Sequence, residues 1–344
     1  ACGKTNLAML IPPKMYRDKG YKVWCVGDDI AWIRIGKDGR MYAVNPENGF
    51  FGVAPGTNEK SNPNALATTK RDTIFTNVVH NLDDNTVWWE GLDNNPPKNA
   101  IDWKGNKWDY TKYDKKDKST CGAHPNSRFT AKAINCPCIS KEFNNPAGVP
   151  LEAIIFGGRR AKTAPLVYES RSWQHGTFVG SIMASETTAA AAGAVGVVRR
   201  DPMAMLPFCG YNMGEYFAHW LEMGEKAAHA PKIFHVNWFR TDKDGNFIWP
   251  GFGDNFRVLL WILDRCAGKA GAVDSAIGYL PKPEDIDTEG LDISADTMKE
   301  LLTVDTESWI ADLDSIKAFY AKIGDTMPKG LLDELATLEA NLKK

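Results

Sequence analysis

The chain has 344 residues, which is enough for about two domains or for one large α/β unit. Its 43% hydrophobic and 24% charged residues exclude a disordered protein, and no run approaches the roughly 18 apolar residues of a membrane span, so we expect no membrane partner. The net charge of −2 conceals an asymmetry, because the chain after residue 282 holds 15 acidic residues against 6 Lys. The rest of the chain is therefore basic, which suits a small anionic ligand. It has no basic stripe with repeated aromatic residues, the pattern that would indicate nucleic-acid binding.

The first half of the chain is predicted to open with a short helix and to continue with strands and loops. A helix is expected to begin near Lys4 and to stop before Pro12, and a strand over 21–27 is expected to end at Asp28 and Asp29. The next expected elements are strands at 32–35 and 41–44 joined by a hairpin turn, a long loop over 45–58, strands at 73–79 and 86–89, and a polar surface insertion over 93–118.

The second half alternates predicted strands and helices. We expect strands at 151–156, 165–169 and 233–238, helices at 203–226 and 258–266, and two or three amphipathic helices from residue 295 to the end. The alternation favours a mixed α/β sheet with helices on its faces, and no internal repeat or domain linker interrupts it.

The chain opens inside a recognisable motif. The run Gly3, Lys4 and Thr5 ends the pattern G-x-x-x-x-G-K-[ST], a loop whose backbone N–H groups, Lys and hydroxyl hold nucleotide phosphates and their metal. The first Gly of the pattern would precede Ala1, so we expect the chain to be part of a longer polypeptide. Because G-K-[ST] arises by chance in roughly one chain in five, a plain helix start stays open. The acidic pair at 28–29, where such proteins place metal-binding carboxylates, favours the nucleotide site.

Two further segments carry candidate binding groups. Arg159 follows two glycines at a predicted strand end, where its guanidinium could bind phosphate or could simply lie on a surface turn. Phe239, Phe247 and Phe252 surround glycines beside Asn255; the rings could hold a purine whose edge the amide reads, although most aromatic clusters are core.

Three other features are weighed by their local chemistry. The Ala- and Gly-rich segment 184–198 is either a mobile lid or a short surface helix. Cys2, beside Lys4, is expected to be a reactive thiolate, although no base lies near it to make it a nucleophile. The seven cysteines, odd in number and unevenly spaced, indicate a reduced intracellular protein, and neither they nor the six histidines form a zinc spacing.

Taken together, these motifs closely resemble GTP-dependent phosphoenolpyruvate carboxykinase, in order and along almost the whole chain; the insertion near Trp88 and Trp103 is more similar to bacterial members. The segments that carry the resemblance are 1–6, 26–32, 45–57, 124–129, 155–160, 172–176, 234–240 and 249–255. The resemblance implies the mixed-sheet P-loop fold of that family, with residues 1–344 forming its carboxy-terminal nucleotide-binding domain, a lid at 185–198 and a helical tail at 295–344.

The resemblance also implies a reaction. Oxaloacetate is decarboxylated to an enolate, which attacks the γ-phosphate of GTP and gives phosphoenolpyruvate, GDP and CO2, early in gluconeogenesis, in the cytoplasm and as a monomer. The implied cofactors are a catalytic Mn2+ and a second Mg2+ or Mn2+ bound with GTP or GDP.

Residue roles follow from the same resemblance. Cys2, Lys4 and Arg159 are the implied catalytic group, with Cys2 included for its place in the phosphate loop. Asp29 is the implied ligand of the catalytic manganese, and Thr5 and Asp28 serve the nucleotide metal. The implied nucleotide-binding residues are Ala1, Gly3, Lys4, Thr5, Asn6, Arg159, Phe239, Phe247, Phe252 and Asn255. The implied substrate-binding residues are Asn126 and Arg128.

Departures from the family keep alternatives open. The lid lacks the Lys-rich segment of animal members, and the amino-terminal part that supplies an Arg, a Tyr and two further manganese ligands is absent from the chain. A non-catalytic GTP-binding fragment therefore remains an alternative. An ATP-dependent carboxykinase or another P-loop kinase is a second alternative, which the three Phe residues of segment 239–252 disfavour.

Overall fold

The protein is described here by a computed structural model that covers residues 3–187 and 196–344. Its helices are α1 (Lys4–Ala8), α2 (Lys14–Arg17), α3 (Pro63–Thr68), α4 (Trp173–Ser181), α5 (Met213–Lys226), α6 (Asn255–Cys266), α7 (Ala295–Leu302), α8 (Thr306–Ile323) and α9 (Lys329–Leu342). Its first strands are β1 (Trp32–Ile35), β2 (Met41–Val44), β3 (Gly49–Val53), β4 (Thr73–Thr76), β5 (Val79–Asn81), β6 (Val87–Trp88), β7 (Ala100–Ile101), β8 (Lys107–Trp108) and β9 (Arg128–Lys132). The later strands are β10 (Val149–Pro150), β11 (Ala153–Gly157), β12 (Val167–Glu169), β13 (Ala184–Glu186), β14 (Val198–Arg200), β15 (Lys232–Val236), β16 (Val273–Asp274) and β17 (Tyr279–Leu280).

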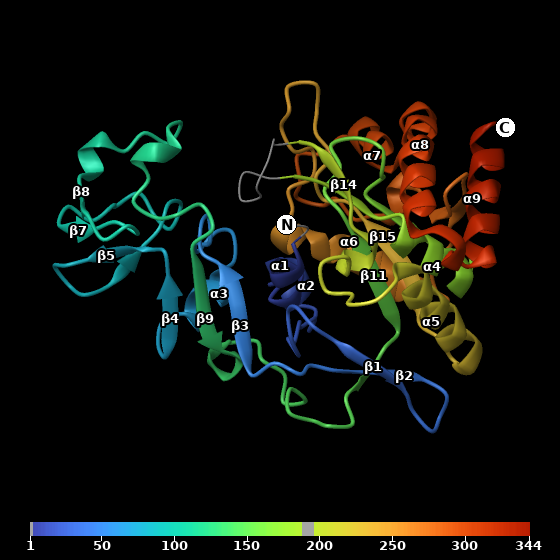
Figure 1. The fold of residues 1–344 in the computed structure, drawn as a ribbon, viewed down its shortest axis with the longest axis horizontal. Coiled ribbons are helices and arrows are strands. Elements are labelled where there is room, and N and C mark those ends of the chain that lie inside the picture. The colour runs from blue at the N-terminus through green and yellow to red at the C-terminus, as the bar shows by residue number, and fades with distance from the viewer. Residues whose placement is uncertain (1–2, 188–195) are drawn as a thin grey trace.

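A five-stranded mixed sheet forms the centre of the larger body, in the order β11-β15-β12-β17-β16. Strands β11 and β15 run parallel, and β12 pairs antiparallel with β15. All three residues of β12 are buried, including Glu169, whose carboxylate pairs with Lys232 and Arg265. Helices α4 and α6 pack against β15 and β11, so the predicted mixed sheet with helices on its faces is confirmed (Figure 1).

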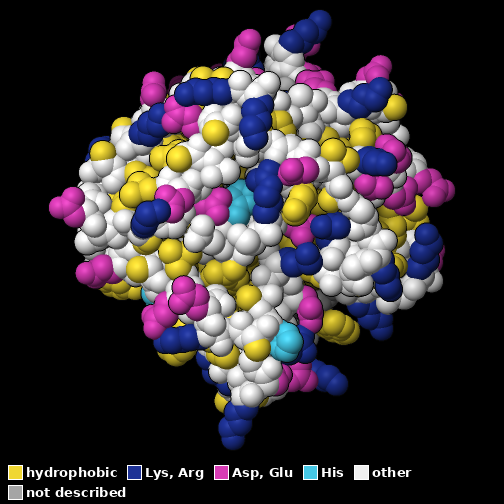
Figure 2. Space-filling view, turned by 90° about the vertical axis from the view of Figure 1, so that its right-hand side faces the viewer, with side chains coloured by type: hydrophobic (Ala, Val, Ile, Leu, Met, Phe, Trp, Pro, Cys, Tyr) yellow, Lys and Arg dark blue, Asp and Glu magenta, His cyan; other side chains and the backbone are white. Residues whose placement is uncertain are grey.

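The C-terminal tail consists of helices α7, α8 and α9, as the amphipathic pattern predicts. Trp309, Leu313, Ile316 and Tyr320 recur every three or four residues along α8, and all four are buried in the main core. Helix α9 packs against α4 and α8, and the three helices lie at the opposite end of the molecule from the β3–β9 region (Figure 1). Lys and Arg side chains lie among Asp and Glu over the face that includes them, so the acidic excess of the tail is spread among bases (Figure 2).

A second core lies beneath strands β3 to β9. Strand β9 pairs antiparallel with both β3 and β4, and β5 to β8 form a separate four-stranded sheet. The Trp88 and Trp108 rings stack with centroids 5.5 Å apart, and Trp89 is almost completely buried. The Trp-rich insertion is therefore a small folded sheet that shares this second core with β3 and β9. None of the helices within residues 3–187 and 196–344 is long and apolar enough to cross a membrane.

Several expected elements differ from the structure, and the strand expected over 73–79 is divided into β4 and β5, which belong to different sheets. The strand expected over 21–27 is reduced to one bridge between Cys25 and Ile139, because the neighbouring segment turns away on both sides of that pair. The loop expected over 45–58 contains strand β3, which exists because β9 pairs with it. The helix expected over 203–226 begins only at Met213, after a short 3-10 turn and a loop.

Candidate active site

The phosphate motif forms the turn before α1. Gly3 has a φ of +95°, a left-handed conformation that glycine adopts without strain, and Lys4 and Thr5 are the first two helical residues. A Cβ on Gly3 would lie 3.9 Å from Trp238, the residue before Phe239, so this turn sits beside the aromatic segment. The predictions for Ala1 and Cys2 fall outside the described residues.

The acidic pair lies directly against this turn. Thr5 Oγ1 donates a hydrogen bond to Asp28 Oδ2 at 2.8 Å, and Lys4 Nζ lies 3.6 Å from Asp29 Oδ1. Burial raises the pKa of the Asp28 carboxyl, the hydrogen bond from Thr5 lowers it, and the nearby charge of Asp29 raises it. An anion held in partial burial beside a second anion is a site that gains from a bound cation.

Glu47 is a third carboxylate at this place, and no sequence motif marks it as a site residue. Its pKa is raised by burial first and then by the charges of Asp29 and Asp28, which places all three acids in one electrostatic field. Asn45 closes a tight turn around it, accepting from the Glu47 N–H at 3.1 Å and donating to the Glu47 carbonyl oxygen at 2.9 Å. The signal that could have revealed it is an acid in an Asn-Pro-Glu-Asn turn after β2.

The donors around the phosphate turn fit a hard divalent cation. Carboxylate and hydroxyl oxygens, such as those of Asp28 and Thr5, are the ligands that Mg2+ and Mn2+ prefer. Across residues 3–187 and 196–344, no three His, Cys, Asp or Glu side chains are arranged to hold a metal ion by themselves. The chain therefore offers part of a coordination shell, which phosphate oxygens or other groups would complete.

Arg159 connects the end of β11 with the aromatic segment. Its guanidinium carbon lies 4.1 Å from the Phe239 ring centroid and 5.5 Å from that of Phe247, within the range of cation–π attraction. Burial lowers the pKa of Arg159, and the charge of Glu186 raises it. Its buried Nε has no hydrogen-bond partner among the described residues, which leaves one guanidinium donor for a ligand.

The predicted purine segment splits into two parts. Phe239 and Phe247 meet edge to face with centroids 5.8 Å apart. Phe252 instead lies in a turn with a φ of +32°, a strained value for a bulky residue, and it packs beside Tyr16 and Phe256. Asn255 follows as the first residue of α6 and is buried.

The turn at residues 252–254 also lies against the chain that leaves α1. A Cβ on Gly253 would come within 2.9 Å of the Ile11 carbonyl oxygen, so only glycine allows this approach. Phe239 therefore lies near the phosphate turn through Trp238, whereas Phe252 lies beside the chain that leaves the other end of α1, through the contact of Gly253 with Ile11.

Asn126 and Arg128 meet at the start of β9. Arg128 Nε donates to Asn126 Oδ1 at 2.9 Å, and the guanidinium lies 5.1 Å from the centroid of the Phe51 ring on β3. A cavity of about 210 Å3 lies between α1 and these two strands, and Thr5 and Asn6 line it together with β3 and Phe129. The structure thus brings the β3–β9 sheet next to the phosphate turn, which sequence separation hides.

The predicted lid is described only at its base. Strands β13 and β14 pair antiparallel, with Ser185 opposite Arg199, and residues 188–195 lie outside the described part. Ser185 Oγ accepts from the Arg159 N–H at 3.0 Å, and the Glu186 N–H donates to the Arg159 carbonyl oxygen at 2.8 Å. The base of the segment is therefore tied to the backbone of Arg159.

Comparison with known proteins identifies a family. The model of the phosphoenolpyruvate carboxykinase C-terminal P-loop domain matches residues 1–341. A phosphoenolpyruvate carboxykinase (GTP) of Anaeromyxobacter dehalogenans is 54% identical over 331 residues, which cover 96% of this chain and 54% of that protein. Proteins of the same name from Chlamydia caviae and Chlamydia muridarum are 53% and 54% identical over the whole chain, which covers 56% and 55% of their lengths. The chain thus spans about half the length of the curated relatives that it matches.

Proposed function

The chain belongs to the family of GTP-dependent phosphoenolpyruvate carboxykinases, and we propose that it is the nucleotide-binding half of an enzyme that converts oxaloacetate and GTP into phosphoenolpyruvate, GDP and CO2. The observation that carries this proposal is the contact of Thr5 with Asp28 and of Lys4 with Asp29. A hydroxyl and an ammonium stand there beside two carboxylates, the combination that phosphoryl transfer with a metal nucleotide requires. We also propose that the full-length protein is a monomer and that it acts in the cytoplasm.

Phosphoryl transfer depends on positioning and charge neutralisation, and the residues near α1 supply both. Lys4 and Gly3 would hold the β- and γ-phosphates of GTP, with Asn6 beside them, and Thr5 and Asp28 would hold the nucleotide's Mg2+ or Mn2+. Asp29 would be a ligand of the catalytic Mn2+. A cation bound there would stabilise negative charge on the enolate oxygen and on the phosphate. Binding a phosphate also releases Lys4 from its exposed pair with Asp29, which frees that carboxylate for the cation.

Different residues would bind the carboxylate substrate and the nucleotide. Arg128 and Asn126 would hold the carboxylate of oxaloacetate or phosphoenolpyruvate, since a guanidinium forms bidentate pairs with carboxylates. Arg159, with an unpartnered Nε, would meet the transferring phosphoryl group. Its contact with the Phe239 ring supports a position near both the phosphates and the base. Phe239, Phe247, Phe252 and Asn255 would surround guanine.

A steady-state assay of the full-length protein tests the proposal. Oxaloacetate decarboxylation coupled to phosphoenolpyruvate formation is measured with GTP and with ATP, in the presence of Mn2+ and Mg2+. We expect turnover with a clear preference for GTP in kcat/KM. Equal or better use of ATP would favour an ATP-dependent carboxykinase. Nucleotide binding without turnover would show that the protein is a non-catalytic GTP-binding protein.

A further inference from the structure

Trp249 and Asn255 share a hydrogen bond inside the loop that leads into α6. Their side chains are only 2% and 5% exposed, and Trp249 Nε1 lies 2.8 Å from Asn255 Oδ1. An indole Nε1–H is a donor and never an acceptor. The amide atom that faces Trp249 must therefore be the oxygen, and the amide nitrogen must point the other way. The chemistry of the indole decides how the amide of Asn255 is turned.

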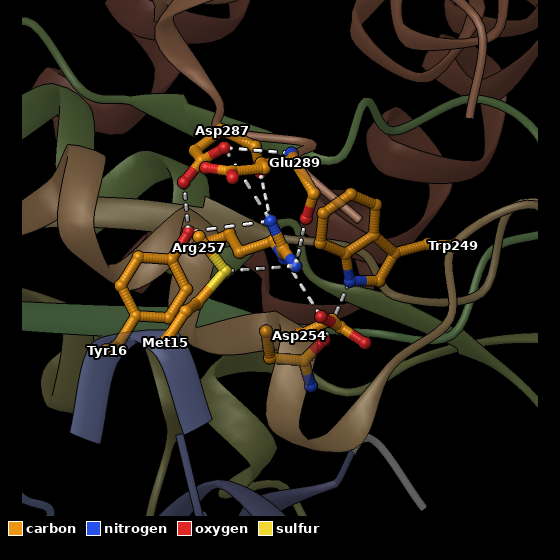
Figure 3. Close-up of polar contacts among 8 residues, drawn as sticks. Met15, Tyr16, Trp249, Asp254, Arg257, Asp287 and Glu289 are labelled. Carbon is orange, nitrogen blue, oxygen red and sulfur yellow. Dashed lines mark hydrogen bonds and ion pairs between the residues drawn. The ribbon is translucent and has the colours of Figure 1, made fainter. Parts of the chain in front are cut away.

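A buried arginine holds the frame in which this pair sits. Arg257 donates to Asp254 Oδ1 and to the carbonyl oxygens of Asp287 and Glu289, each at 2.9 Å (Figure 3). Tyr16 of α2 hydrogen-bonds Asp287 on the far side of the same cluster. These contacts tie the first turn of α6 to α2 and to the segment around residue 287. The backbone of Asn255 is therefore held in place, so the hydrogen bond from the Trp249 indole sets the orientation of the Asn255 side-chain amide and does not move the loop.

The amide nitrogen of Asn255 is the group left for a ligand. No residue within 3–187 or 196–344 accepts a hydrogen bond from its Nδ2, yet this atom is not among the buried polar atoms without a partner, so it keeps access to solvent. The neighbouring Phe252 is held in a left-handed turn after Gly251, whose φ is +77°. Backbone strain of this kind persists where the surrounding structure fixes a conformation for a purpose. A fixed NH2 donor thus stands three residues from a fixed aromatic ring.

We propose that Trp249 determines the base specificity of the nucleotide site by turning the Asn255 amide so that its NH2 group meets the ligand. Guanine presents a keto oxygen at its six position, whereas adenine presents an amino donor there. The NH2 group of Asn255 can donate a hydrogen bond to the keto oxygen of guanine. It cannot pair with the amino group of adenine, because both groups are donors, so adenine binding would leave two donors unpaired. The inference rests on the proposed GTP-dependent function and adds a positioning residue that lies behind the base-reading amide.

The test compares two tryptophan variants of the full-length protein. W249F keeps an aromatic ring and removes the N–H, whereas W261F is the matched control, because Trp261 lies on α6, is 2% exposed and has an Nε1 without a partner. The assay measures kcat/KM for GTP, ITP and ATP. We expect W249F to lower the GTP-to-ATP ratio roughly tenfold, the effect of about one hydrogen bond. Efficiency with ITP should fall in parallel, because hypoxanthine shares the keto oxygen and lacks the two-amino group. W261F should leave the GTP-to-ATP ratio and the ITP-to-ATP ratio unchanged.

Two further variants separate orientation from packing. N255D still accepts from Trp249 but offers no donor to the ligand, so its GTP-to-ATP ratio should fall as well. In an N255A background, W249F should change the ratio no further, because Trp249 acts only through Asn255. A W249F ratio equal to wild type, or an equal loss in W261F, overturns the inference while GTP preference stands. If W249F does not fold, N255D decides, and an unchanged ratio refutes the inference. A wild-type protein without GTP preference would instead overturn the proposed function.

Discussion

Replacing Asp312 by Asn is predicted to destabilise the protein by about 3 kcal/mol. Asp312 lies on α8, and its side chain is 8% exposed. Its Oδ2 is 3.3 Å from Arg160 Nη1, and its Oδ1 forms a close ion pair with Arg200 Nη2; those two side chains are 11% and 8% exposed. One carboxylate therefore compensates two buried guanidinium groups, and it ties α8 both to the end of β11 and to β14.

The magnitude follows from the burial of all three groups. Removing one partner of a buried ion pair costs about 3–5 kcal/mol, because the remaining charge stays out of water without compensation. Asn keeps the shape of Asp and one acceptor oxygen, which places the D312N variant at the lower end. Unfolding entropy of roughly 2.1 cal/mol/K per residue gives about 0.7 kcal/mol/K for 344 residues. The expected fall in Tm is therefore about 4 °C.

Urea denaturation followed by tryptophan fluorescence and by circular dichroism measures the effect, and thermal unfolding checks it. The matched control is D333N, because Asp333 pairs with Lys329 at 2.6 Å on the exposed face of α9. An exposed pair of this kind contributes at most about 0.5 kcal/mol. A loss below about 1 kcal/mol in D312N, or one equal to that of D333N, would refute the reasoning that the buried carboxylate compensates both arginines.

Three further predictions concern the site and its surroundings. D29N should lower the turnover of the full-length protein by several orders of magnitude, since the proposed ligand of the catalytic cation is lost; a near-normal kcat in a folded variant would contradict this. Thiol reagents should label Cys2 faster than Cys209, and GTP should slow the labelling, as peptide mapping with and without nucleotide would show; equal rates would contradict the placement of the phosphate loop. Burial lowers the pKa of His175 to about 4, and its Nδ1 accepts from the Arg171 N–H. Below about pH 6.5 the unfolded chain takes up a proton that folded His175 does not, so the free energy of unfolding should fall from about pH 6.5 to about pH 4. In H175N this dependence, measured by urea unfolding, should be flatter by one proton, and an unchanged slope would show that His175 titrates normally.

The local pattern of the chain was enough to predict several elements. The hairpin over 32–44, strands β11 and β15 and the amphipathic helices of the tail depend on periods of two or of three to four residues, and the structure confirms them. The adjacency of Lys4 and Thr5 to the acidic pair 28–29 was also expected, since a phosphate motif and two acids have a known chemical relation. Short-range chemistry sufficed because each of these signals lies within a few residues or within one motif.

Other features depend on which distant segments lie side by side, and the tertiary structure alone decides that. The Gly-rich sequence of β3 predicts a loop, and it forms a strand only because β9, some 80 residues later, lies beside it. Glu47 joins the field of Asp28 and Asp29 for a similar reason, after the chain has returned through the β1–β2 hairpin. The direction of the Asn255 amide is set by the indole of Trp249, and no residue pattern encodes that contact. Sequence fixes the chemical groups, whereas their orientation follows from packing, because a donor or a charge acts only on the atoms that the fold places within reach.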